Sequence, residues 1–326
     1  MRNTPGKALG VAMLMSGLLP PGSPAATSYP LTVSSCGRPV VIRHPPRRAV
    51  VDDVNMAGMM FALGLQPQMA GVAGITGYHR VTPGFRAAQG GIPELAPRYP
   101  SLEQLLGAGT DLFVAGWNYG MRVGGEVTPD SLARFGIPTL VLSESCAIDG
   151  SLRRDPDMVL LYDDEERLGR VFDRDAQARA LVSEWRRRVA AVVARVAHDP
   201  PVRVFLYDSG IDAPFTAGRY ALATAMIRLA GGRNIFADLP TSWGGASWEA
   251  VIARDPELIV LTDAGNGTAA LRARLERDSV LGRLAAVRNR RFLSVRYEAL
   301  TPGPEDLDAI EAMAAAMHPA AARGAP

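Results

Sequence analysis

The sequence lacks any marked excess of charge of one sign. It holds 35 Lys and Arg residues against 33 Asp and Glu residues, which gives a formal net charge of +2. Proteins that bind nucleic acid generally carry a basic patch or stripe, so this balance argues against a nucleic-acid partner. Beyond residue 25, no apolar run approaches the ~20 residues that a membrane-spanning helix needs. We therefore do not expect a chain embedded in a membrane.

The sequence also lacks the motifs of common catalytic and metal sites. It contains no G-x-S-x-G nucleophile elbow, no P-loop and no G-x-G-x-x-G turn. None of the four histidines (His44, His79, His198 and His318) lies at a metal-ligand spacing from another His or Cys. We therefore expect no enzyme, no cofactor and no metal held directly by protein side chains.

The N-terminus has the pattern of a signal peptide. Arg2 and Lys7 flank the start of an apolar stretch over residues 8–19, and small residues at 23–25 offer a cleavage site. No Cys follows the apolar stretch, so a lipid-modified anchor is not supported. We expect residues 1–25 to be removed and the mature chain to be free in the periplasm.

Cysteine is scarce, with only Cys36 and Cys146 in the chain. An oxidising compartment permits a disulfide between them. That bond would close a loop of roughly 110 residues and stabilise the fold by about 4 kcal/mol in the chain-entropy model. The alternative is a pair of buried free thiols.

Short strand-like and helix-like segments alternate along the chain, which is typical of the α/β class with parallel sheets. The predicted strands cover residues 49–52, 112–115, 139–142, 203–207, 258–261 and 291–295. The predicted helices cover residues 56–63, 101–106, 129–135, 221–229, 247–253 and 304–317. Residues 155–197 are helical throughout, with a break near Phe172 and Asp173 and a stop at Pro200 and Pro201. We expect an N-terminal lobe over 27–154, a helical linker and the start of the second lobe over 155–198, and a C-terminal lobe over 199–318.

An internal repeat indicates that the two lobes are alike. Residues 101–114 (SLEQLLGAGTDLFV) align without gaps to residues 247–260 (SWEAVIARDPELIV). Each copy begins with Ser at an expected helix N-cap and has Glu in the first turn, and each continues into a buried strand. The pattern predicts two Rossmann-like lobes, although any two helix–strand units share some of these features.

The loops after the predicted strands carry the candidate binding residues. Ligands of open α/β sheets lie outside the carboxyl ends of the strands. The residues expected there are Asn55, Tyr78, His79, Trp117, Asn118, Tyr119, Tyr207, Asp208, Phe215, Arg219, Trp243, Arg296 and Tyr297. The aromatic members suit stacking on a large planar ligand, and Arg219 and Arg296 could pair with anionic groups. For any one aromatic residue, packing between the lobes is an equal alternative.

Several segments resemble one family of transport proteins. They are residues 205–210 (FLYDSG), 214–218 (PFTAG), 230–237 (AGGRNIFA), 242–243, 247–256 (SWEAVIARDP), 62–65 (ALGL) and 99–103 (YPSLE). Together they resemble the helical-backbone solute-binding proteins of ABC importers for iron–siderophore complexes and vitamin B12. The resemblance covers about residues 32–317, and it adds Tyr99 to the expected binding residues.

The resemblance implies two lobes bridged by one long helix, a shallow cleft, and a membrane permease with its ATPase as partners of a monomeric protein. It implies that Trp243 packs against the ligand, that Glu126 docks on the permease, and that Cys36 and Cys146 pair. We expect the ligand to be a metal chelate whose metal is held by the chelator. A ferric siderophore is our first expectation, cobalamin or another tetrapyrrole-like ligand our second, and an exported enzyme on a related scaffold the remaining alternative.

Overall fold

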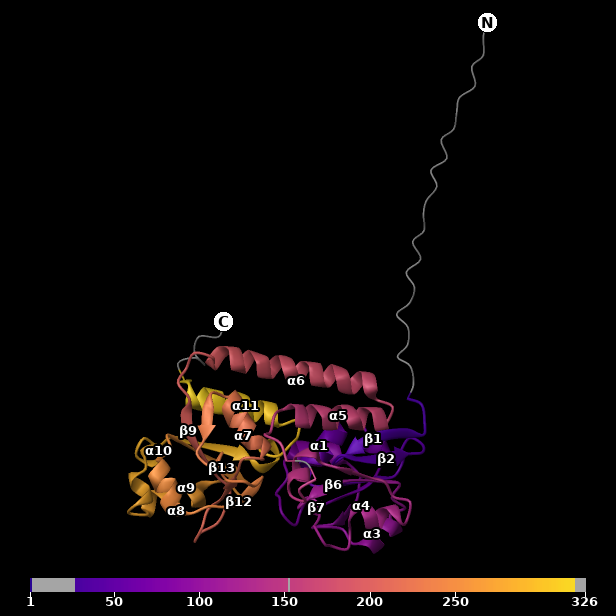
Figure 1. The fold of residues 1–326 in the computed structure, drawn as a ribbon, viewed down its shortest axis with the longest axis horizontal. Helices are drawn as coiled ribbons and strands as arrows, with labels where there is room; N and C mark the ends of the chain where they lie inside the picture. Colours follow the sequence, from indigo (N-terminus) through magenta and orange to yellow (C-terminus); the bar gives the residue numbers. More distant parts are fainter. Residues whose placement is uncertain (2–26, 152, 320–326) are drawn as a thin grey trace.

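The computed structural model describes residues 1, 27–151 and 153–319 and shows two α/β lobes side by side (Figure 1). Apart from Met1, the predicted signal peptide lies outside the described residues. One long helix runs along the same side of both lobes, a second lies between it and the first lobe, and the N-terminal hairpin belongs to the first lobe. The predicted α/β class and the two-lobed architecture are confirmed.

The first lobe contains a parallel sheet in the order β5-β4-β3-β6, with β8 on the other side of β6 and β7 beside the end of β6. The strands are β3 (Ala49–Asp52), β4 (Met69–Ala73), β5 (Glu94–Ala96), β6 (Leu112–Trp117), β7 (Gly120–Met121) and β8 (Thr139–Val141). Its helices are α1 (Val54–Ala62), α2 (Pro83–Gln89), α3 (Leu102–Gly107) and α4 (Pro129–Ala133), with short 3₁₀ turns η1 (Gln66–Gln68) and η2 (Ser143–Ala147). An antiparallel hairpin of β1 (Leu31–Ser35) and β2 (Arg38–Ile42) precedes the sheet.

The second lobe contains a parallel sheet in the order β11-β9-β13-β14. Its strands are β9 (Val202–Tyr207), β11 (Gly232–Asn234), β13 (Leu258–Asp263) and β14 (Phe292–Arg296), and β10 (Phe215–Ala217) and β12 (Trp243–Gly245) form a separate antiparallel pair. The helical elements are α7 (Leu222–Leu229), α8 (Trp248–Arg254), α9 (Ala269–Arg277), η3 (Leu281–Arg283), α10 (Ala285–Arg288), η4 (Tyr297–Ala299) and α11 (Asp306–Met317).

The two copies of the repeat occupy equivalent places. The Ser101 hydroxyl accepts a hydrogen bond from the Gln104 N–H at 3.2 Å and caps α3, and the Ser247 hydroxyl accepts one from the Ala250 N–H at 3.2 Å and caps α8. The helices lead into β6 and β13, each of which has a parallel neighbour on both sides. The repeat therefore marks the same helix–strand unit in each lobe.

Helices α5 (Val159–Val171) and α6 (Asp175–Val196) connect the lobes. The chain turns between them at Asp173, whose φ is 55°, close to the predicted break. Helix α6 lies along both lobes and packs against α5 at one end and α11 towards the other (Figure 1). The second sheet begins at Val202, and the C-terminal part of α6 packs against α7 and α11 of the second lobe.

A disulfide joins Cys36 to Cys146, with the two Cα atoms 5.5 Å apart. It connects the turn of the β1–β2 hairpin to η2, across a sequence separation of 110 residues. The predicted pairing is confirmed, and the alternative of two free thiols is excluded.

Helices α5 and α11 bury acidic side chains. Glu165 and Asp306 are both 0% exposed, and burial raises the pKa of each well above its usual range. Burial also raises the pKa of Glu305, which precedes α11, to about 7. Burial therefore favours the protonated form of each of these groups in the folded chain.

Replacing Cys36 with Ser should lower the melting temperature of the non-reduced protein by about 5–10 °C, because the unfolded chain regains the freedom of a long loop. Thermal unfolding followed by circular dichroism measures this shift. Cys146→Ser should give the same shift, and reductant should lower the melting temperature of the wild type but of neither variant. An unchanged melting temperature in both variants would show that the bond does not constrain the fold.

The contribution of Glu305 to the free energy of unfolding should fall by about 2 kcal/mol as the pH rises from about 5 to 8. The folded-state pKa of Glu305 lies above its unfolded value, so the stabilisation is complete below the unfolded pKa and is lost as the pH rises through about 7. Urea unfolding at a series of pH values measures the slope. Glu305→Gln should reduce the slope by that amount and leave the part that comes from the other buried acids, whereas an unchanged slope in this variant would contradict the assignment.

Candidate ligand-binding cleft

A cleft of about 350 Å³ lies between the lobes. Its lining residues are Asn118, Tyr119, Ala147, Ile148 and Arg153, which precede the long helices, and Asp208, Phe215, Pro240, Thr241, Ser242, Trp243 and Tyr297 of the second lobe. The cleft lies where β6, β9 and β14 end, because Asn118, Asp208 and Tyr297 each directly follow one of these strands. This is the edge at which ligands of parallel α/β sheets bind.

Two aromatic rings form one wall of the cleft. Phe215 on β10 and Trp243 on β12 stack with their centroids 6.5 Å apart and their planes at 15°. Antiparallel pairing of these short strands places Trp243 opposite Ala217, on the same ribbon as Phe215. Phe215 remains 39% exposed, so the wall presents apolar surface that the protein itself does not cover. Such a surface can stack on a flat, bulky ligand.

A polar cluster joins the lobes at Tyr297. The Tyr297 hydroxyl donates a hydrogen bond to Asp53 Oδ2 at 3.1 Å, and His79 Nε2 lies 3.2 Å from Asp53 Oδ1. The His79 and Tyr297 rings stack with centroids 4.3 Å apart. Burial, followed by the Asp53 carboxylate, raises the pKa of Tyr297 well above its usual range. Tyr297 therefore stays neutral and acts as a hydrogen-bond donor.

Glu144 connects the lobes beneath the aromatic wall. It lies on η2, is 2% exposed, and its Oε1 accepts hydrogen bonds from the Leu222 N–H at 2.9 Å and the Ser242 hydroxyl at 3.0 Å. The Tyr119 hydroxyl lies 3.5 Å from Oε2. Burial raises the pKa of Glu144 to about 7, against the opposing effect of these donors.

Sequence reasoning missed both Glu144 and Arg153. Glu144 is two residues from Cys146, so the predicted disulfide drew attention to its segment. No pattern in the sequence showed that the Glu144 side chain reaches the other lobe. Arg153 lies in a loop between η2 and α5. Arg153 is the positively charged side chain among the residues that line the cleft.

The structure brings together six of the predicted binding residues as lining of the cleft: Asn118, Tyr119, Asp208, Phe215, Trp243 and Tyr297. Burial raises the pKa of Asp208 above its usual value, with an opposing effect from the Ser209 hydroxyl.

Three further predicted residues lie beside the cleft. Tyr99 donates a hydrogen bond to the Asn118 carbonyl at 2.5 Å, and Tyr78 is exposed with its ring 6.1 Å from that of Tyr99. His79 is the third, through its stacking on Tyr297.

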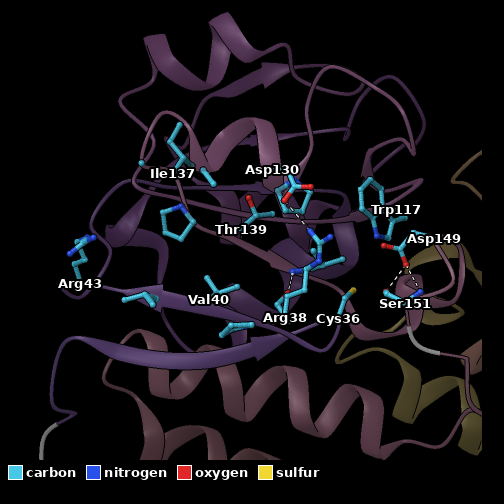
Figure 2. Close-up of a pocket in the computed structure, with 18 residues that line it drawn as sticks. Cys36, Arg38, Val40, Arg43, Trp117, Asp130, Ile137, Thr139, Asp149 and Ser151 are labelled. Atoms are coloured by element: carbon cyan, nitrogen blue, oxygen red, sulfur yellow. Dashed lines mark hydrogen bonds and ion pairs between the residues drawn. The ribbon is translucent and has the colours of Figure 1, made fainter.

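The other predicted residues do not line the cleft. Trp117 ends β6 buried in the core of the first lobe, and it lines a different hollow of about 310 Å³ beside Cys36 and Thr139 (Figure 2). Tyr207 is fully buried, stacks on Phe205, and donates to the Gly210 carbonyl. Trp117 packs on the face of the first sheet that α3 and α4 cover, and Tyr207 packs on the face of the second sheet that α8 and α9 cover.

Asn55 and the two predicted arginines have structural partners. Asn55 is 0% exposed and donates to the Pro302 carbonyl at 2.9 Å. Arg219 is exposed and pairs with Asp155 at 2.7 Å. Arg296 pairs with Glu298 and also donates to the Arg80 carbonyl at 3.1 Å. These three residues are corrected from ligand contacts to contacts within the protein.

Metal-binding side chains do not gather in the part of the chain that the structure describes. No group of three or more His, Cys, Asp or Glu residues there could hold a metal ion. Over the same residues, no helix has the length and apolar character to span a membrane.

Comparison with known proteins finds relatives that match most or half of the chain. The chain is 26% identical over 324 residues to a cobalamin-binding protein of Halobacterium salinarum, across 95% of this chain and 82% of that one. It is 31% identical over 163 residues to a vitamin B12-binding protein of Yersinia pestis, across 50% of this chain and 52% of that one.

A solved structure is similar over nearly the whole fold. It comes from an ABC-type Fe³⁺-hydroxamate transport system of Saccharomonospora viridis, with a TM-score of 0.76 and 25% identity, and covers 89% of this chain and 99% of its own. The family model for periplasmic binding proteins matches residues 52–298, which include both lobes and the cleft. The chain belongs to the periplasmic binding protein family, whose members are extracytoplasmic substrate-binding proteins of transporters.

Proposed function

We propose that the protein captures a bulky metal chelate in the cleft between its lobes and delivers it to the permease and ATPase of an ABC importer, without catalysing a reaction. The observation that carries the proposal is the exposed Phe215–Trp243 wall, which offers a stacking surface. We also propose that residues 1–25 direct export to the periplasm and are then removed, and that the mature protein acts as a monomer.

The charge of the cleft favours a ligand of low net charge. Arg153 and Asp208 are the charged side chains among its lining residues, and they have opposite signs. Arg219 and Arg296, which suggested an anionic siderophore, are paired with Asp155 and Glu298. We therefore place a corrinoid such as cobalamin first, because its amide groups and flat ring suit neutral donors and an aromatic wall. The similarity to the Fe³⁺-hydroxamate transport protein supports a ferric hydroxamate as the second candidate.

Isothermal titration calorimetry with cyanocobalamin and with a ferric hydroxamate tests the ligand class. We expect saturable binding of cyanocobalamin with one site per chain, and recovery of the ligand unchanged after incubation. Binding of neither chelate, or conversion of either to a product, would refute the proposal. Tight binding of the ferric hydroxamate alone would reverse the order of the two candidates.

Replacing Trp243 with Ala should weaken ligand binding about 10- to 100-fold, since it removes a large part of the stacking surface. Its melting temperature should change little, because the ring is only partly buried. Trp117→Phe is the matched control and should bind as the wild type does, because Trp117 lies in the core of the first lobe. Equal affinity of Trp243→Ala and wild type would place the ligand elsewhere.

We propose that Glu126 contacts the permease. It is exposed in the loop between β7 and α4 of the first lobe. Glu126→Arg should reduce ligand uptake by cells severalfold, since it would repel a basic surface, and should leave the affinity measured by calorimetry unchanged. Glu103→Arg, at an exposed position on α3 of the same lobe, is the control. Normal uptake with Glu126→Arg would remove this residue from the docking surface.

A further inference from the structure

Glu144 reaches from the first lobe to two separate points of the second. Its Oε1 accepts from the backbone N–H of Leu222, the first residue of α7, and from the side chain of Ser242, which precedes Trp243. The Trp243 indole N–H also lies near enough to favour the ionised carboxylate, although its geometry falls short of a hydrogen bond. A single oxygen therefore fixes the base of the aromatic wall against the opposite lobe.

We propose that Glu144 is the positioning residue of the cleft, which holds the Ser242–Trp243 wall against the first lobe, and that its neutral form is the one that captures ligand. This proposal rests on the proposed function, because the wall must contact the ligand for its position to matter. Glu144 itself is covered and acts through Ser242 and Trp243.

The backbone around Glu144 is held firmly. Cys146 is bonded to Cys36, so η2 is tied to the N-terminal hairpin. The Ser145 hydroxyl donates to the Leu142 carbonyl at 2.7 Å and accepts from the Trp117 N–H at 3.0 Å. Because η2 is anchored on both sides of Glu144, the carboxyl group keeps its place in the first lobe. A change in its hydrogen bonds therefore has to move the segment of the second lobe that contains Ser242 and Trp243.

The surroundings of Glu144 contain neutral donors and another acid. Tyr119, on the turn between β6 and β7, has a pKa raised well above its usual range by burial and then by Glu144, so its phenol stays neutral. Asp306 at the start of α11 is the nearby acid, and burial also raises its pKa well above the usual range. The charged residues that line the adjacent cleft are Arg153 and Asp208. No cation contributes to the pKa of Glu144.

These surroundings set the direction of the pH effect. An ionised Glu144 carries a buried charge that only neutral donors and nearby solvent stabilise. A bulky ligand that fills the cleft above Tyr119, Ser242 and Trp243 expels that solvent and makes the charge less favourable. Ligand binding should then favour proton uptake by Glu144, so affinity should rise as the pH falls through about 7.

The first test needs no ligand. The fluorescence emission of Trp243 is obtained by subtracting the emission of the same protein carrying Trp243→Phe. In the wild type, this emission should change in one step near pH 7 as the pH is varied. Glu144→Gln, which keeps both accepted hydrogen bonds but cannot ionise, should show no step. Asp208→Asn is the control for the other acid of the cleft and should keep it. A step that persists in Glu144→Gln overturns the proposal.

The second test measures the dissociation constant of cyanocobalamin at pH 6 and pH 8. Wild-type affinity should be about two- to fivefold weaker at pH 8, which corresponds to a rise of about half a unit to one unit in the pKa of Glu144 on binding. Glu144→Gln should keep the pH 6 affinity of the wild type at both values, and Glu144→Ala should bind weakly at both.

Two outcomes of the second test also overturn the proposal: a wild-type pH dependence in Glu144→Gln, or wild-type affinity in Glu144→Ala. Circular dichroism of each variant checks that the fold is intact. If the wild type binds no cyanocobalamin at either pH, the corrinoid assignment fails, and the ligand-free emission step still decides the role of Glu144.

Discussion

An apolar stripe along α6 fixes the two lobes relative to one another. Its buried residues are Ala178, Val182, Trp185, Val189, Val192 and Val196, spaced alternately four and three residues apart, so they share one face of the helix. Trp185 lies near Tyr162 of α5, and Val196 packs at Gly231 of the second lobe. The stripe belongs to one continuous core that includes strands of both sheets. Closing or opening the cleft by a wide rotation would expose this core, so a largely preformed site is the expected consequence.

Two polar connections complete the joint on the cleft side. The Asp53–Tyr297 hydrogen bond and the Glu144 contacts with Leu222 and Ser242 each join a loop of the first lobe to the second. In both connections, a buried carboxyl group accepts hydrogen bonds from uncharged donors. These bonds set the position of one lobe relative to the other without a strongly charged surface in the cleft. The core joins the lobes on the side of α6, and these hydrogen bonds set the distance between the walls of the cleft. The chelate proposed for the site would then meet rigid aromatic and hydroxyl groups.

The recognition surface combines a flat apolar wall with few charges. Phe215 and Trp243 supply contact area, while Arg153 and Asp208 leave the lining close to electrical balance. Affinity for a bulky chelate would come from stacking and desolvation, and selectivity from uncharged polar side chains of the lining such as Asn118. This division explains why abundant arginine in the sequence was a poor guide to the ligand: Arg219 and Arg296 serve ion pairs within the protein.

The sequence by itself determined the α/β class, the two lobes, the repeated helix–strand unit and the central strands. These follow from local patterns: buried apolar runs, Ser N-caps and helix breaks depend on neighbours a few residues away. Eight of the strands that the structure describes escaped prediction. Strands β5, β7, β10, β11 and β12 have only two or three residues, β1 and β2 are partly exposed, and the buried strand β4 is rich in small residues. Only the tertiary structure decided which loop residues face the cleft. Trp117 turns into the core while Asn118 and Tyr119 line the cleft, and Glu144 gains its role from Leu222 and Ser242, which lie 78 and 98 residues away. Side-chain direction at a strand end and contacts between distant segments depend on packing, which no local pattern records.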